Sequence, residues 1–143
     1  MARKKEQLLY DRFKDKAENR LLFHRIENLM MNGMPDMIVQ NRRGVTAWVE
    51  NKAIDAWPVR ASTIPLRSAF QKGQLSFLRE CISWSGNAFV LLRVGKGIGA
   101  EYYLLDPNQA LDCMSRAYLI ERACFAGGLD AIVTYLENLK YED

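Results

Sequence analysis

Two short motifs in this chain combine two carboxylates with one ammonium group. The first motif is Gly33–Asp36, with the letters GMPD, and the second is Glu50–Lys52, with the letters ENK. Their two acidic residues are fourteen positions apart. Two carboxylates and a lysine are a minimum set of side chains for metal-assisted cleavage of a phosphodiester. The motifs therefore indicate a hydrolytic metal site, on the condition that the fold brings them together.

The segment between the motifs has the pattern of a β-hairpin. Two apolar runs, residues 37–40 and 45–51, flank a polar turn with the letters NRRG. A hairpin that is symmetric about Arg43 places Asp36 opposite Glu50. Directly opposed residues of an antiparallel pair have Cβ atoms about 4.5–5.5 Å apart. Both carboxylates are then predicted to reach one hard cation, which prefers oxygen ligands.

The same hairpin predicts how the second motif is arranged. Because side chains alternate along a strand, Glu50 and Lys52 share one face while Asn51 points to the other. Pro35 fits the first position of a strand, since it has no N–H to donate to a ladder.

Other elements must carry this hairpin. Apolar spacing predicts a helix over residues 4–23, followed by a strand-like stretch at 22–30. Residues 53–67 are the least regular part, and Ser68 is a suitable N-cap for a helix that ends near Trp84. The later elements are strands at 89–93 and 101–105, joined by the glycine-rich letters GKGIG, and a helical tail at 107–143.

The order of the elements predicts a single α/β domain over residues 1–143. Its core spans about 4–106, and residues 107–143 form a helical extension. The GKGIG segment lies between two strands and lacks the ending of a phosphate-binding loop, so a hairpin is the better interpretation.

Composition excludes several classes of protein. The 143 residues are 49% apolar and 26% charged, which is ordinary for a globular domain. An apolar run long enough to cross a membrane is missing, and the charged N-terminus is not followed by a signal core. The three cysteines have no CxxC spacing, and one histidine cannot build a histidine metal site. We expect a cytoplasmic protein whose net charge of +3 permits nucleic-acid binding without requiring it.

Taken in order, the motifs resemble the PD-(D/E)xK nuclease superfamily. The nearest resemblance is to the small virus-type replication-repair nucleases (VRR-NUC), phage-type relatives of archaeal Holliday junction resolvases. It covers about residues 20–106 and includes the letters GMPDMIV, WVENKA, QLSFL from Gln74, and GNAFVLLR from Gly86. The resemblance implies a restriction-endonuclease-like fold, in which helices flank a mixed β-sheet with an αβββαβ core.

The resemblance also implies roles for individual residues. Asp36, Glu50 and the backbone carbonyl of Asn51 would bind a divalent cation, which is expected to be Mg²⁺ with Mn²⁺ able to substitute. Lys52 would orient the attacking water and offset charge on the phosphate. Gln74 matches the helix glutamine of the family, with Gln71 as its rival.

A further acidic ligand is expected upstream of the GMPD motif. Glu18 fits a helical position facing the sheet and is preferred. Glu27 lies just before the motif, where phage-type relatives read similarly, and Glu6 is a more distant third.

These roles predict an endodeoxyribonuclease that leaves a 5′-phosphate. The expected substrate is branched or junction DNA, and the expected assembly is a homodimer, because a junction offers two symmetric strands to cut. A phage origin suits so small a domain and would place it in the host cytoplasm. The expected phosphate contacts are basic residues in the hairpin turn and in the segment after Lys52: Arg42, Arg43, Arg60, Arg67 and Lys72.

Two alternatives remain open at this point. One is a sequence-specific endonuclease of the restriction or homing type. The other is a DNA-binding module that kept the fold without cleavage, against which the intact Asp36, Glu50 and Lys52 argue.

Overall fold

The elements follow the order that the resemblance implies. The computed structural model describes residues 2–26 and 33–141. The first part of the chain contains α1 (Ala2–Ala17), β1 (Leu22–Arg25), β2 (Met37–Gln40), β3 (Thr46–Ile54), α2 (Gln74–Ser83) and β4 (Ala88–Val94). The second part contains the 3₁₀ turn η1 (Gly97–Gly99), β5 (Glu101–Leu105), the 3₁₀ turn η2 (Pro107–Gln109), α3 (Arg116–Arg122), β6 (Phe125–Ala126) and α4 (Leu129–Glu137). The predicted αβββαβ core and the α/β fold class are confirmed.

The described strands form one six-stranded sheet in the order β1-β2-β3-β4-β5-β6. Only β3 and β4 pair in parallel, and the other neighbours are antiparallel. A parallel pair needs a long crossover, which residues 55–87 provide with α2 inside it. Every residue of β4 is buried, which agrees with its nearly continuous apolar sequence.

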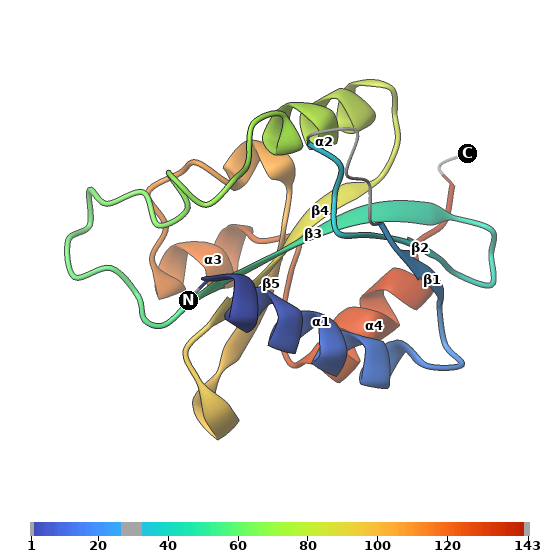
Figure 1. Cartoon of the computed structure of the whole chain (residues 1–143), viewed down its shortest axis with the longest axis horizontal. Helices are drawn as coiled ribbons and strands as arrows, with labels where there is room; N and C mark the ends of the chain where they lie inside the picture. The colour runs from blue at the N-terminus through green and yellow to red at the C-terminus, as the bar shows by residue number, and fades with distance from the viewer. Residues whose placement is uncertain (1, 27–32, 142–143) are drawn as a thin grey trace.

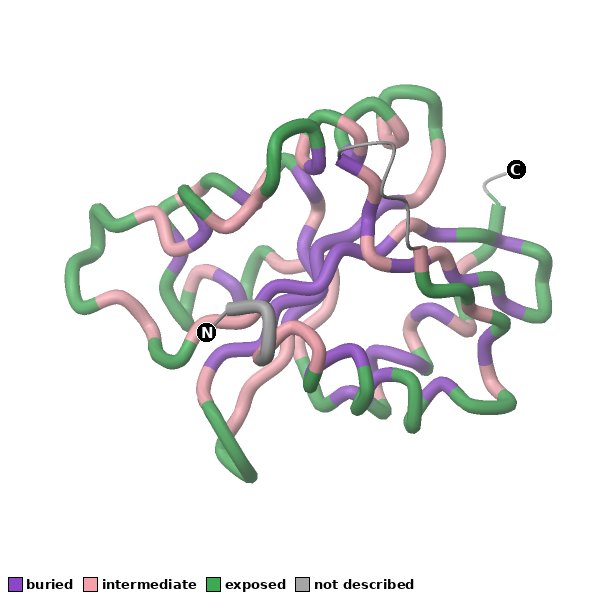
Figure 2. The backbone as a smooth tube through the Cα atoms, in the orientation of Figure 1, coloured by how far each residue is buried: buried purple, intermediate pink, exposed green. Residues whose placement is uncertain are grey.

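Helices cover both faces of the sheet (Figure 1). On one face, Leu9 and Phe13 of α1 pack with Ile132 and Val133 of α4 against the strands. On the other face, Leu78 of α2 and Leu119 of α3 belong to a second buried cluster: Leu66, Leu78, Ala88, Val90, Leu92, Val94, Tyr103, Leu105, Ala110, Met114 and Leu119. The buried backbone is concentrated in the central strands between these layers (Figure 2).

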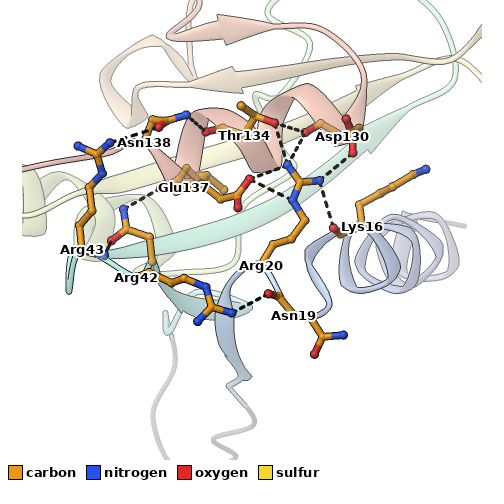
Figure 3. A network of polar contacts seen from close by, with 11 residues as sticks. Lys16, Asn19, Arg20, Arg42, Arg43, Asp130, Thr134, Glu137 and Asn138 are labelled. Atoms are coloured by element: carbon orange, nitrogen blue, oxygen red, sulfur yellow. Dashed lines mark hydrogen bonds and ion pairs between the residues drawn. The ribbon is translucent and has the colours of Figure 1, made fainter.

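Arg20, which follows α1 in the chain, links the end of that helix to α4 (Figure 3). The Arg20 guanidinium donates to Asp130 at 2.7 Å, to Thr134 at 2.8 Å and to Glu137 at 2.6 Å. The sequence predicted that residues 107–143 form a helical extension outside the core, and the structure differs on both points. This segment supplies α4 to one hydrophobic cluster, and β6 within it pairs with β5.

Two helix boundaries differ from prediction for local reasons. α1 ends at Ala17, because Asn19 adopts a positive φ of 64° and the chain turns into β1. α2 begins at Gln74, and its N-cap is Gly73 at φ 88° in place of the predicted Ser68. Residues 68–73 are used in turns that pack near Lys52, so their backbone does not continue the helix.

Candidate metal centre and active site

The β2–β3 hairpin has the predicted register. Met37 pairs with Val49, and Ile38 pairs with Trp48. One step further along, Asp36 meets Glu50 as predicted. The backbone N–H of Asp36 donates to Glu50 Oε1 at 3.1 Å, and the N–H of Asn51 donates to Asp36 Oδ2 at 2.8 Å. Each carboxylate is thus held by the backbone of the opposite segment.

A third carboxylate joins these two, and it comes from α1. β3 continues to Ile54, beyond Val49, which pairs with the first residue of β2, and in the described sheet its last residues pair with β4 alone. The start of α1 lies there, since Lys5 Nζ is 2.7 Å from Asp55 Oδ2. One oxygen each of Glu6, Asp36 and Glu50 lies within 4.8 Å of the others. We call these three residues the acidic cluster.

The structure does not bring Glu18, the preferred upstream acidic residue, to the acidic cluster. Glu18 is exposed, just past the end of α1. It stands twelve residues beyond Glu6, which corresponds to about 18 Å along a helix. Glu27 lies outside the described residues. A signal for Glu6 was present in the sequence, because Glu6 continues the buried stripe of Leu9, Phe13 and Ala17 at helical spacing.

Lys52 is buried against the acidic cluster, with only 3% of its surface exposed. Its Nζ atom is 3.0 Å from Glu50 Oε2 and 3.5 Å from Glu6 Oε1. It also donates a long hydrogen bond of 3.4 Å to Gln74 Oε1. Glu50 and Lys52 therefore share a face, as strand alternation predicts, and the helix glutamine beside them is Gln74. The side chain of its rival Gln71 is exposed.

Burial makes Glu50 an unusual carboxyl group. Its removal from water, and then the neighbouring Asp36, raise its pKa to about 8, although Lys52 acts in the opposite direction. Burial also raises the pKa of Glu6, with Lys52 lowering it and Asp36 raising it. Within the described residues, Glu50 Oε2 accepts no hydrogen bond of good geometry, and Lys52 Nζ is its close polar contact.

This donor set fits a hard divalent cation. Such cations prefer carboxylate oxygens, and the acidic cluster offers three that converge. The buried Glu50 Oε2 that lacks a hydrogen bond is an oxygen that a cation would satisfy. The structure does not test the role of the Asn51 carbonyl, which stays a prediction. The Asn51 side chain is 1% exposed and finds no hydrogen-bond partner in the described part of the chain.

The basic residues predicted to contact DNA lie in two places. Arg42 and Arg43 are in the turn at the far end of the hairpin from the acidic cluster. Arg42 donates to the carbonyl of Asn19 at 3.0 Å, and Arg43 to Asn138 Oδ1 at 3.4 Å (Figure 3). The others lie exposed on the segment that joins β3 to α2: Arg60, Arg67 and Lys72.

The choice between Glu6 and Glu18 is directly testable. We expect Glu6→Gln to weaken Mg²⁺ binding by about tenfold or more, one tenfold step being about 1.4 kcal/mol. Glu18→Gln removes the same charge outside the acidic cluster and should leave the affinity unchanged. Calorimetric titration of Mg²⁺ into the three proteins measures this, and equal weakening by both variants would contradict the placement of Glu6.

A backbone contact holds the first motif against the start of α2. Gly33 has a φ of 93°, and a Cβ atom there would lie 2.7 Å from the carbonyl carbon of Gly73. We expect Gly33→Ala to lower the free energy of unfolding by about 2 kcal/mol more than Gly44→Ala. Gly44 is the matched control, because its φ of 78° is also positive but its Cβ would meet nothing within 4 Å. Urea denaturation of both variants gives the comparison, and equal losses would mean that steric overlap contributes nothing.

An archaeal nuclease shares this architecture. The 1.6 Å structure of Hjc, a Holliday junction resolvase from the hyperthermophile Archaeoglobus fulgidus, matches with a TM-score of 0.56. The match covers 91% of this chain and 98% of Hjc. This chain has a Holliday junction resolvase fold. Hjc belongs to the PD-(D/E)xK nuclease superfamily, and at 12% sequence identity the likeness establishes the fold alone.

Comparison at the level of sequence adds nothing to the structural likeness. No protein-family model and no curated protein matches this chain. In residues 2–26 and 33–141, no helix combines the length and the apolar character needed to cross a membrane.

Proposed function

We propose that this protein is a metal-dependent endodeoxyribonuclease that hydrolyses phosphodiester bonds in branched DNA. One observation carries the proposal: a buried lysine contacts Glu50 and Glu6 at the end of a hairpin that holds Asp36 against Glu50. The Hjc-like fold supports it independently. Burying the ionisable groups of Glu50 and Lys52 lowers stability. A domain that only binds DNA would have no reason to keep such buried groups.

The residues divide the work by their chemistry. The carboxylates of Asp36, Glu50 and Glu6 would hold a divalent cation, expected to be Mg²⁺. When bound, such a cation supplies positive charge to the phosphate and makes water a better nucleophile. Lys52 orients the attacking water and stabilises the charge that grows on the phosphate oxygens. Gln74 accepts a hydrogen bond from Lys52 and so directs its ammonium.

DNA would approach along the segment between β3 and α2. This segment carries the exposed Arg60, Arg67 and Lys72 and leads from Lys52 to Gln74. Cationic side chains near the scissile bond position the backbone without reading its sequence, which suits a nuclease that recognises DNA shape. We propose that two copies act together on a junction, leaving 5′-phosphate ends. Arg42 and Arg43 are not part of this surface.

A cleavage assay tests the proposal. The purified protein is incubated with linear duplex, flap and four-way-junction DNA, with Mg²⁺ or with a chelator, beside Asp36→Ala. We expect Mg²⁺-dependent cutting of the junction and no cutting by the variant. If the parent protein cuts none of the three substrates, the enzyme proposal fails. Equal cutting of all duplexes would refute selectivity for branched DNA, and full activity of Asp36→Ala would refute the site.

A further inference from the structure

Two residues just before and at the start of α2, Phe70 and Gln74, contact the ammonium group of Lys52. The Nζ atom of Lys52 lies over the ring of Phe70, 5.0 Å from its centroid. Gln74 Oε1, 3.4 Å from the same nitrogen, is held in turn by the backbone N–H of Gln71 at 2.9 Å. We call Phe70 and Gln74, with the Gln71 N–H, the lysine cradle.

Both ends of the cradle are anchored. The cradle lies at the end of the connection of residues 55–73, which runs out from the end of β3 and returns to the start of α2 (Figure 1). Before the cradle, Leu66 is only 1% exposed within the cluster beneath α2, and its carbonyl accepts from the N–H of Ala69 at 3.1 Å. Within it, Gly73 packs closely against the backbone of Gly33 in the GMPD motif. The ring and the amide oxygen are therefore placed by the core and by the GMPD motif together.

The cradle differs from the other contacts of Lys52 because it is neutral. Glu50 and Glu6 contact the ammonium through carboxyl oxygens, and the same oxygens would hold a cation. Once a cation occupies the acidic cluster, the carboxylates attract Lys52 less. A ring face and an amide oxygen also attract an ammonium group, and they are not among the oxygens that would bind the cation. Their hold on Lys52 does not depend on whether the acidic cluster is occupied.

We propose that Phe70 is a positioning residue for Lys52, keeping its ammonium at the reacting phosphate when the carboxylates are engaged by a cation. The role rests on the proposed nuclease function. A flexible four-carbon stem needs such support, because small displacements of a positioned group cost a large part of its effect. Phe70 is only half-buried, so it contributes less to the core than a fully buried aromatic does.

Two substitutions at Phe70 and one matched control test this role. Phe70→Leu removes the ring, and Phe70→Tyr keeps it. Phe77→Leu makes the same change on α2. The Phe77 ring packs edge-on against Trp48, with 5.1 Å between the ring centroids. The placement is measured first by NMR, since protons over a ring face shift upfield. We expect upfield ε-methylene protons of Lys52 in the parent, Phe70→Tyr and Phe77→Leu, and an ordinary shift in Phe70→Leu.

Cleavage kinetics then measure the consequence. With Mg²⁺ saturating, we expect Phe70→Leu to lower kcat about 3- to 30-fold with KM unchanged, the range that a cation–π contact supplies. Phe70→Tyr should restore kcat to near the parent value, and Phe77→Leu should leave it near that value. An unchanged kcat in Phe70→Leu, or ordinary Lys52 shifts in the parent, would overturn the proposal. Upfield Lys52 shifts in a parent that cuts no DNA would instead refute the nuclease function while supporting the placement of Lys52 by Phe70.

Discussion

Glu50→Gln is expected to stabilise the metal-free protein at pH 8 while abolishing metal-dependent cleavage. In the folded chain the pKa of Glu50 is about 8, whereas its ordinary value is 4.5. Between these values the folded state binds more protons than the unfolded state, so the free energy of unfolding falls as pH rises. Each unit of pKa shift corresponds to about 1.4 kcal/mol, so the total loss is on the order of a few kcal/mol. A glutamine resembles the protonated carboxyl group and does not incur this loss.

Guanidinium denaturation at pH 5 and pH 8, in the presence of a chelator, checks the expectation. At pH 5 the parent and Glu50→Gln should be similar, and at pH 8 the variant should be the more stable. Glu80→Gln is the control, because Glu80 is exposed on α2 and outside the acidic cluster. Added Mg²⁺ should stabilise the parent but not Glu50→Gln, since only the native parent binds it well. The same pH dependence in the parent and Glu50→Gln would show that the burial of Glu50 has no cost.

Lys52→Met is expected to reduce the single-turnover rate of junction cleavage by about 10²- to 10³-fold, the usual effect of losing one group that stabilises transition-state charge. Methionine keeps most of the buried stem, so the loss reports on the ammonium more than on packing. DNA affinity should remain, because the exposed Arg60, Arg67 and Lys72 make the proposed contacts with the DNA backbone.

Lys72→Met supplies the contrast. Lys72 is exposed two residues before Gln74, so its loss should weaken DNA binding and lower the salt dependence without changing the single-turnover rate at saturation. Gel-shift titration and rapid-quench cleavage of one labelled junction separate the two effects. If Lys52→Met cleaves at the parent rate, the assignment of Lys52 to catalysis is wrong.

The parts of the site that sequence reasoning reached are those that depend on short-range geometry. Asp36 and Glu50 are joined by a hairpin of four- and nine-residue strands, whose register follows from its turn. Alternation along β3 then puts Lys52 on the face of Glu50. Gln74 was reached through the resemblance of its motif and lies beside Lys52 in the structure.

The parts that sequence reasoning missed depend on how distant segments pack. Glu6 joins the acidic cluster only because α1 lies where β3 outruns β2. A pattern of helical spacing marks its face but does not say which end of the helix approaches the site. Phe70 falls inside the helix predicted from Ser68 to Trp84, but its contact with Lys52 depends on a helix that begins only at Gln74. The strand β6 is two residues long, too short for any periodicity to predict.

Local sequence was enough to predict the hairpin and the chemistry of its two carboxylates and lysine, because neighbours along a strand are placed by backbone geometry alone. The third carboxylate and the neutral cradle of Lys52 come from long-range packing. Those residues are separated from the hairpin by long stretches of chain, and their approach depends on which buried faces pack together. The close contact between Gly33 and Gly73 connects the first motif, which local sequence predicts, to the start of α2, which long-range packing places.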